Sequence, residues 1–189
     1  SQAHAYLYAT DFSPFTSATS NFYRINPATG GVTLIGNTGE SKLTGITRDS
    51  DGSIYSANEA SSSYFMRINP ATGAASRIER IGTRTHYEGD LAIDPLTGAL
   101  YYATSTNRSG QWTDSLFTIN KADGSATKLF DLDSAMARDI SGLQFIQGTL
   151  YALSTAFGED SLLTIDLGTG AVTFIGTTGV NFIRAAGMA

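Results

Sequence analysis

Basic and aromatic residues recur at fixed places along this chain, and their types favour recognition of a ligand over catalysis. Basic side chains lie shortly before small-residue segments, and aromatic side chains lie in the connections between them. Basic groups ringed by exposed aromatic rings suit a glycan, a carboxylate or a protein partner. The alternative reading is that they are solvated charges and rings that anchor loops. The residues that we expect to bind are Lys42, Arg84, His86, Trp112, Arg138 and Arg184.

Catalytic motifs give little support for an enzyme. Ser125-Ala126-Thr127-Lys128 matches the Ser-x-x-Lys pattern of penicillin-recognising acyl enzymes, in which a helix brings Lys to the nucleophile. Here the pattern falls on an expected strand, which directs Ser125 and Lys128 to opposite faces. The chain has no Cys and two His, so it has neither a thiolate nor a His-rich metal site.

Acidic residues are candidates both for catalysis and for calcium binding. Glu88, Asp90 and Asp139 lie near the small-residue segments, but their spacing does not select a carboxylate pair for glycoside cleavage. Asp49-Ser50-Asp51-Gly52 begins like a calcium loop and lacks the later acidic ligand. We therefore expect no catalytic residue and no resident cofactor or metal, with calcium at an acidic turn as the minor alternative.

A turn sequence repeated four times indicates the elements that must position these residues. Ile25-Asn26-Pro27-Ala28-Thr29-Gly30 recurs in related form at residues 68–73, 119–124 and 165–170. Each copy follows an apolar run and precedes a β-branched or small-residue run. Pro fixes φ early and Gly supplies a positive φ at the end, so each copy predicts a β-hairpin turn.

Two further markers share this period. An aliphatic–Tyr pair opens a strand at Tyr8, Tyr55, Tyr101 and Tyr151, and small-residue strands precede the last three. Four short strands in about 45 residues are typical of a β-propeller blade. We predict an all-β fold, a single β-propeller domain over residues 1–189 with four blades of four antiparallel strands. The expected blades are residues 185–189 with 1–36, 43–82, 89–132 and 140–176.

The two ends of the chain are expected to complete one blade together. Gly187 matches the inner-strand marker, and the count from it through both chain ends to Tyr8 equals ten, within the spacing of 9 to 11 inside the chain. Such a clasp hides sheet edges. We expect it to close within one chain. The alternatives are an eight-bladed ring of two chains and an open filament.

The Leu-Tyr-Ala, Ile-Asn-Pro-x-Thr-Gly and Thr-x-Ile-Gly elements resemble β-propeller repeats of secreted and cell-surface bacterial proteins. The resemblance covers all four predicted blades, and it implies the fold without implying an activity. Residues 121–123 and 167–168 depart from the turn pattern.

Composition limits the classes of partner. A net charge of −5 argues against non-specific binding of nucleic acid, and no apolar run is long enough to be inserted in a membrane. We expect a non-catalytic extracellular or cell-surface propeller that binds a glycan or protein. The alternative is a structural subunit that assembles through its terminal strands, as a homo-oligomer or filament; a hydrolase or lyase ranks below both.

Overall fold

The structure, a computed structural model, describes most of the 189-residue chain. The described residues are 6–11, 18–60, 63–81, 86–108, 111–133, 135, 137–155 and 160–179; at residues 86, 87, 107, 108, 111 and 112 only the backbone is described. Within these ranges the secondary structure consists of strands and turns, without a helix. Accordingly, no helix of the described part could span a membrane.

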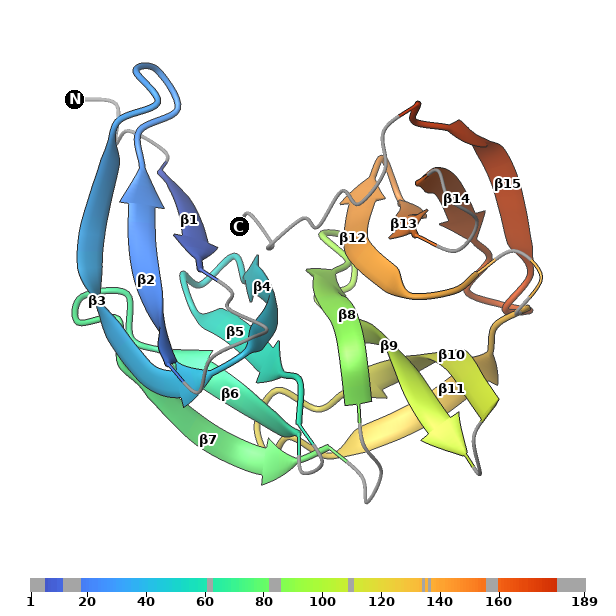
Figure 1. Ribbon diagram of the computed structural model, residues 1–189, viewed down its shortest axis with the longest axis horizontal. Helices are drawn as coiled ribbons and strands as arrows, with labels where there is room; N and C mark the ends of the chain where they lie inside the picture. Colours follow the sequence, from blue (N-terminus) through green and yellow to red (C-terminus); the bar gives the residue numbers. More distant parts are fainter. Residues whose placement is uncertain are drawn as a thin grey trace.

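The described strands form four antiparallel sheets that follow one another around a common axis (Figure 1). The first sheet contains β1 (Leu7–Thr10), β2 (Thr19–Ile25) and β3 (Val32–Ser41). The second contains β4 (Leu43–Arg48), β5 (Ile54–Asn58), β6 (Tyr64–Ile68) and β7 (Ala75–Arg80). The third contains β8 (His86–Ile93), β9 (Leu100–Arg108), β10 (Gln111–Ile119) and β11 (Ala126–Asp131). The fourth contains β12 (Ile140–Ile146), β13 (Thr149–Ser154), β14 (Ser161–Ile165) and β15 (Val172–Thr177).

This arrangement is a four-bladed β-propeller, as the repeats predict. The repeated Tyr residues occupy one position in every blade, because each lies opposite the residue just before the Ile that starts the turn. The pairs are Tyr8 with Arg24, Tyr55 with Arg67, Tyr101 with Thr118 and Tyr151 with Thr164.

Each repeated turn is held by hydrogen bonds within itself. In the first copy the Asn26 side chain accepts from Ala28 N at 2.9 Å, and Gly30 N donates to Asn26 O at 2.8 Å. Gly30 has a φ of 68°, in the left-handed region that Gly adopts without strain. The third and fourth copies keep this geometry with Asn120 and Asp166, despite their departures in sequence.

In the described part of the chain, the core consists of three apolar clusters, one at each interface between consecutive blades. Between the first and second blades, Phe22 packs with Ile46, Ile54, Met66 and Ile68. Two similar clusters fill the second and third interfaces. Successive blades therefore adhere through sheet-on-sheet packing, with apolar area removed from water as the driving force.

Inner strands β4 and β8 approach closely because one of them has Gly at the contact. A Cβ placed on Gly45 would lie 2.8 Å from the Cα of Asp90 and would also overlap its carboxylate. No rotation of the Asp90 side chain would relieve the backbone contact. The small residue at this position is therefore required by the spacing of two blades.

The expected clasp of the two chain ends lies outside the described residues. In the first sheet three strands are described, and residues 185–189, which would add the fourth, remain a prediction. The blade boundaries predicted from the sequence depend on that clasp and stay predictions as well.

Replacing Gly45 by Ala should lower the free energy of unfolding by about 2–3 kcal/mol, because the added methyl group forces β4 away from Asp90. Gly176→Ala is the matched control. That glycine also lies in a strand, but its added Cβ would meet nothing within 4 Å, so the change should stay within about 0.5 kcal/mol. Urea denaturation of both variants measures the difference, and equal stabilities would contradict the close approach.

Candidate functional site

The candidate site is the end of the propeller where the outer strand of one blade leads to the inner strand of the next. We call it the loop face and define it by Lys42, Glu59, Arg138, Asp139 and Thr155. The described charged side chains of this face include positive and negative groups, and they lie on backbone that is fixed by hydrogen bonds. The opposite end, where the repeated hairpin turns lie, is called the turn face.

Lys42 lies on the loop face immediately before β4. Its φ is 56°, which is unusual for a residue with a side chain. The N–H of Glu59 donates to Lys42 O at 2.8 Å, and Lys42 Nζ lies 3.9 Å from a carboxylate oxygen of Glu59. The ammonium group therefore remains partly exposed beside an acidic neighbour.

Arg138 and Asp139 occupy the corresponding place before β12, and both are exposed. The hydroxyl of Ser154 donates to Arg138 O at 2.6 Å and accepts from Arg138 N at 3.0 Å. Asp139 has a φ of 47°. A buried Ser thus anchors the backbone under an exposed guanidinium group.

Backbone strain of this kind marks the start of all three described inner strands. Glu88, which precedes Asp90 in β8, has a φ of 47°, and its carbonyl accepts from Thr104 Oγ1 at 2.9 Å. Left-handed conformations of non-glycine residues cost about 1–3 kcal/mol each, and they persist only where surrounding contacts hold them. Such positions occur frequently at binding sites.

Asp114 lies buried beneath the loop face, at the interface between the third and fourth blades. Its carboxylate accepts from Ser105 Oγ at 2.6 Å, from Asp139 N at 3.1 Å and from Ile140 N at 3.3 Å. Burial raises the pKa of Asp114 above its ordinary value, while the Ser105 hydroxyl and the Ile140 N–H act in the opposite direction. The sequence analysis did not identify this residue, and nothing in its local sequence distinguishes it.

Asp90 lies near the axis, where the inner strands meet. Its carboxylate accepts from Leu91 N at 2.8 Å and from Leu143 N in β12 at 2.9 Å. Burial raises the pKa of Asp90 well above its ordinary value, and hydrogen bonds from the N–H groups of Leu143, Leu91 and Ile46 counteract part of that effect. The group joins three blades and does not face solvent.

The structure places part of the predicted binding set. Lys42 and Arg138 both lie at the loop face, and their role in binding stays a prediction. Trp112, which was expected on a loop, lies in β10, because β9 and β10 continue to Arg108 and from Gln111. The backbone of His86 lies in β8, while the side chains of His86 and Trp112, and all of Arg84 and Arg184, lie outside the described part.

The other sequence candidates take part in local contacts. Ser125 Oγ donates to Asp123 at 2.7 Å, whereas Lys128 Nζ bonds to Asp131 at 2.8 Å, so the Ser-x-x-Lys match does not form a catalytic pair. In the calcium-like turn Asp49 accepts from Lys121 Nζ at 2.5 Å. Among the described residues no three acidic or His side chains gather as a metal site.

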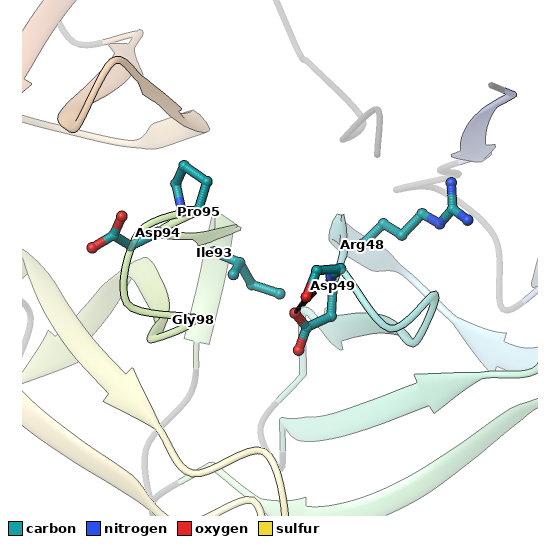
Figure 2. A pocket seen from close by; sticks show the side chains of 7 residues that line it. Arg48, Asp49, Ile93, Asp94, Pro95 and Gly98 are labelled. Atoms are coloured by element: carbon teal, nitrogen blue, oxygen red, sulfur yellow. Dashed lines mark hydrogen bonds between the residues drawn. The ribbon is translucent and has the colours of Figure 1, made fainter.

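A hollow of about 470 Å³ lies on the turn face, between the second and third blades (Figure 2). Its lining residues are Arg48, Asp49, Ser50, Ile93, Asp94, Pro95 and Gly98. Ile93 points across the hollow towards Asp49, while Arg48 and Asp94 extend in opposite directions. Hydrogen bonds from the Leu96 N–H and Thr97 hydroxyl hold the pKa of Asp94 below its ordinary value. These polar groups stabilise turns and do not converge on one point.

The hollow was not predictable from local motifs, because two turns that lie far apart in the sequence form it. Residues 93–98, Ile-Asp-Pro-Leu-Thr-Gly, repeat the hairpin motif, but they connect β8 to β9 instead of the two outer strands. The position of this fifth copy of the motif was the sequence signal that could have indicated the hollow.

Comparison with known proteins supports the class that this geometry defines, a β-propeller. No family model matches the chain, and no curated protein matches it. A chain in the crystal structure of a nidogen/laminin complex is 13% identical, with a TM-score of 0.65 over 94% of this chain and 63% of its own. A putative gluconolactonase is also 13% identical, with a TM-score of 0.55 over 94% and 65%.

TolB from Acinetobacter baumannii is a third similar structure, 15% identical with a TM-score of 0.56, over 91% of this chain and 41% of its own. The protein thus spans less than two thirds of the length of each of these chains. At such identities the likeness shows the fold.

Asp114 generates a prediction about pH. Because its folded pKa lies above the ordinary value of 3.8, its contribution to stability is present below that pH and is lost as the pH rises through the folded pKa. Wild type should therefore lose stability relative to Asp114→Asn between pH 4 and neutrality, by about 1.4 kcal/mol for each pKa unit between the folded and unfolded values. Urea denaturation over this pH range measures the difference. A stability advantage of wild type that grows with pH would contradict the raised pKa.

Proposed function

We propose that this protein is a non-catalytic extracellular or cell-surface propeller that binds a protein partner through its loop face. A glycan is the alternative ligand for the same face. Two related observations carry the proposal. The buried carboxylates beneath this face accept hydrogen bonds from backbone N–H groups. The charged side chains above them are exposed and lie on fixed backbone.

The commitment of Asp90 and Asp114 argues against a hydrolytic site. General acid–base catalysis needs a carboxyl group within hydrogen-bond reach of a substrate proton. Asp90 is 4% exposed and Asp114 is 2% exposed, and each accepts at least two backbone N–H bonds. A substrate would have to displace the bonds that hold adjacent blades together.

The exposed charges fit a protein surface. Lys42 beside Glu59 and Arg138 beside Asp139 present both signs within short distances. Charge patterns of this kind favour binding of a surface with complementary charges and disfavour surfaces with like charges. Arg is also enriched at protein interfaces. Fixed backbone lowers the entropy lost on binding. Arg84, His86, Trp112 and Arg184 remain proposed members of the site.

The location outside the cell is proposed from composition and from the resemblance of the repeats. The chain combines 20 Gly with few Lys, and its repeats resemble those of secreted and cell-surface propellers. One similar structure is that of a nidogen/laminin complex, so a similar fold occurs in a complex of two proteins. Another is described as a putative gluconolactonase, so turnover requires a direct test.

The binding face can be tested by reversing its charges. The double variant Lys42→Glu/Arg138→Glu should lose partners that wild-type protein captures from extracts of the source cells and their medium, as quantified by mass spectrometry. Arg48→Glu/Lys128→Glu is the matched control, because it makes the same change in net charge away from the loop face. Both variants should keep the wild-type melting temperature to within a few degrees, since surface substitutions cost about 0.5 kcal/mol or less.

Four outcomes distinguish the alternatives. A partner lost by the loop-face variant and kept by the control supports the proposal, whereas equal capture by all three proteins refutes the loop face. Binding on a glycan array that shows the same charge dependence favours the glycan alternative. Turnover of nitrophenyl esters, nitrophenyl glycosides or simple lactones above the buffer rate would contradict a non-catalytic role.

A further inference from the structure

The first and fourth blades each have an apolar face that the described residues leave partly uncovered. The first end face consists of Leu7, Tyr23, Ile25 and Val32, on the side of the first blade that points away from the second. Tyr8 and Phe22 stack at 5.3 Å and pack towards the second blade, so their strand neighbours Leu7 and Tyr23 point the other way.

Equivalent residues in the other blades are covered by the preceding blade. Ile25 is half-buried, but Ile68, Ile119 and Ile165 at the same position are 1%, 4% and 3% exposed. Val32 is 63% exposed, whereas its counterparts Ala75, Ala126 and Val172 pack against the interface clusters. Among the described residues, the first end face is thus equivalent to a blade interface, without another blade packed against it.

The last end face shows the complementary pattern. It consists of Leu153, Leu162 and Ile175, on the side of the fourth blade that points away from the third. Leu162 is half-buried, while its counterparts Phe22, Phe65 and Leu116 are fully buried by the following blade. Ile175 is 55% exposed, whereas Ile35 and Ile78 at the same position pack against clusters and Leu129, the counterpart in the third blade, is 36% exposed.

We infer that the last end face of one copy of this chain packs against the first end face of a second copy. A second copy is the expected partner because the contact would continue the existing blade interfaces. In those interfaces, the surface equivalent to the first end face packs against the preceding blade, and the last end face is the side of the fourth blade that would make the same contact. In a single chain, the described strands of the first and fourth sheets lie apart from each other (Figure 1), and Val32 and Ile175 remain exposed.

Two such contacts related by a two-fold axis close a ring of eight blades, in place of the closure within one chain that the sequence favours. Each contact is head-to-tail and repeats the packing already present three times within the chain. This inference is independent of the binding function proposed for the loop face, since neither end face includes Lys42 or Arg138.

The test begins with the mass of the 189-residue chain in solution. Sedimentation velocity over a wide range of protein concentrations should give twice the 20.0 kDa chain mass. Val32→Lys and Ile175→Lys should each reduce the mass to that of one chain, because a desolvated Lys opposes an apolar contact. Leu96→Lys is the control: Leu96 is 81% exposed on the turn face, so this variant should keep the wild-type mass.

A mixing experiment tests the direction of the contact. A tagged Val32→Lys chain retains an intact last end face, and an Ile175→Lys chain retains an intact first end face. The two should co-purify, whereas tagged and untagged Val32→Lys chains should not. Circular dichroism should show that both variants keep the wild-type spectrum.

A single-chain mass for wild type at all concentrations would overturn the inference, as would a mass that grows without limit. Unchanged mass in both Lys variants would also overturn it. Dissociation together with the wild-type spectrum would support it, and a variant that unfolds would be replaced by Val32→Thr or Ile175→Thr, for which the same loss of mass is expected.

Discussion

A single buried carboxylate connects the inner strands, and the spacing of three blades depends on it. Asp90 bonds within β8 and to Leu143 in β12, while the N–H of Ile46 in β4 also contributes. A buried charge is costly unless its lone pairs are occupied, so the three N–H groups and the carboxylate require each other. Gly45 is part of the same constraint, because any side chain there would occupy the space of Asp90.

Asp114 repeats this arrangement one interface further on and nearer the loop face. Its bonds to Asp139 N and Ile140 N hold the beginning of β12 against the third blade. Because that backbone is fixed from below, Asp139 can retain its left-handed conformation. The polar interior of the propeller thus determines how the exposed residues of the proposed binding face are presented.

Local features of the fold were predictable from the sequence, whereas contacts between distant strands were not. The hairpin turns and the four equivalent Tyr positions depend on neighbouring residues and on a fixed period. Asp90 and Leu143, by contrast, are 53 residues apart, and neither lies in a motif. Trp112 was misplaced because the β9–β10 hairpin is longer than those of the other blades. Of the candidate site, the positions of Lys42 and Arg138 were predictable because both lie just before inner strands, whereas their role in binding stays a prediction.

The repeated turns also make the protein a suitable framework for insertion. The Asn26 and Asn69 turns bond to themselves, through the side chain of their first residue and the final Gly, and most of their residues are exposed. The first turn is the most suitable, because a Cβ on Gly30 would meet nothing within 4 Å, whereas Gly73, Gly124 and Gly170 lie against the preceding blade. A peptide inserted at the Asn26 turn would therefore disturb one hairpin tip without breaking a contact between blades, and the propeller would display the foreign sequence at its turn face.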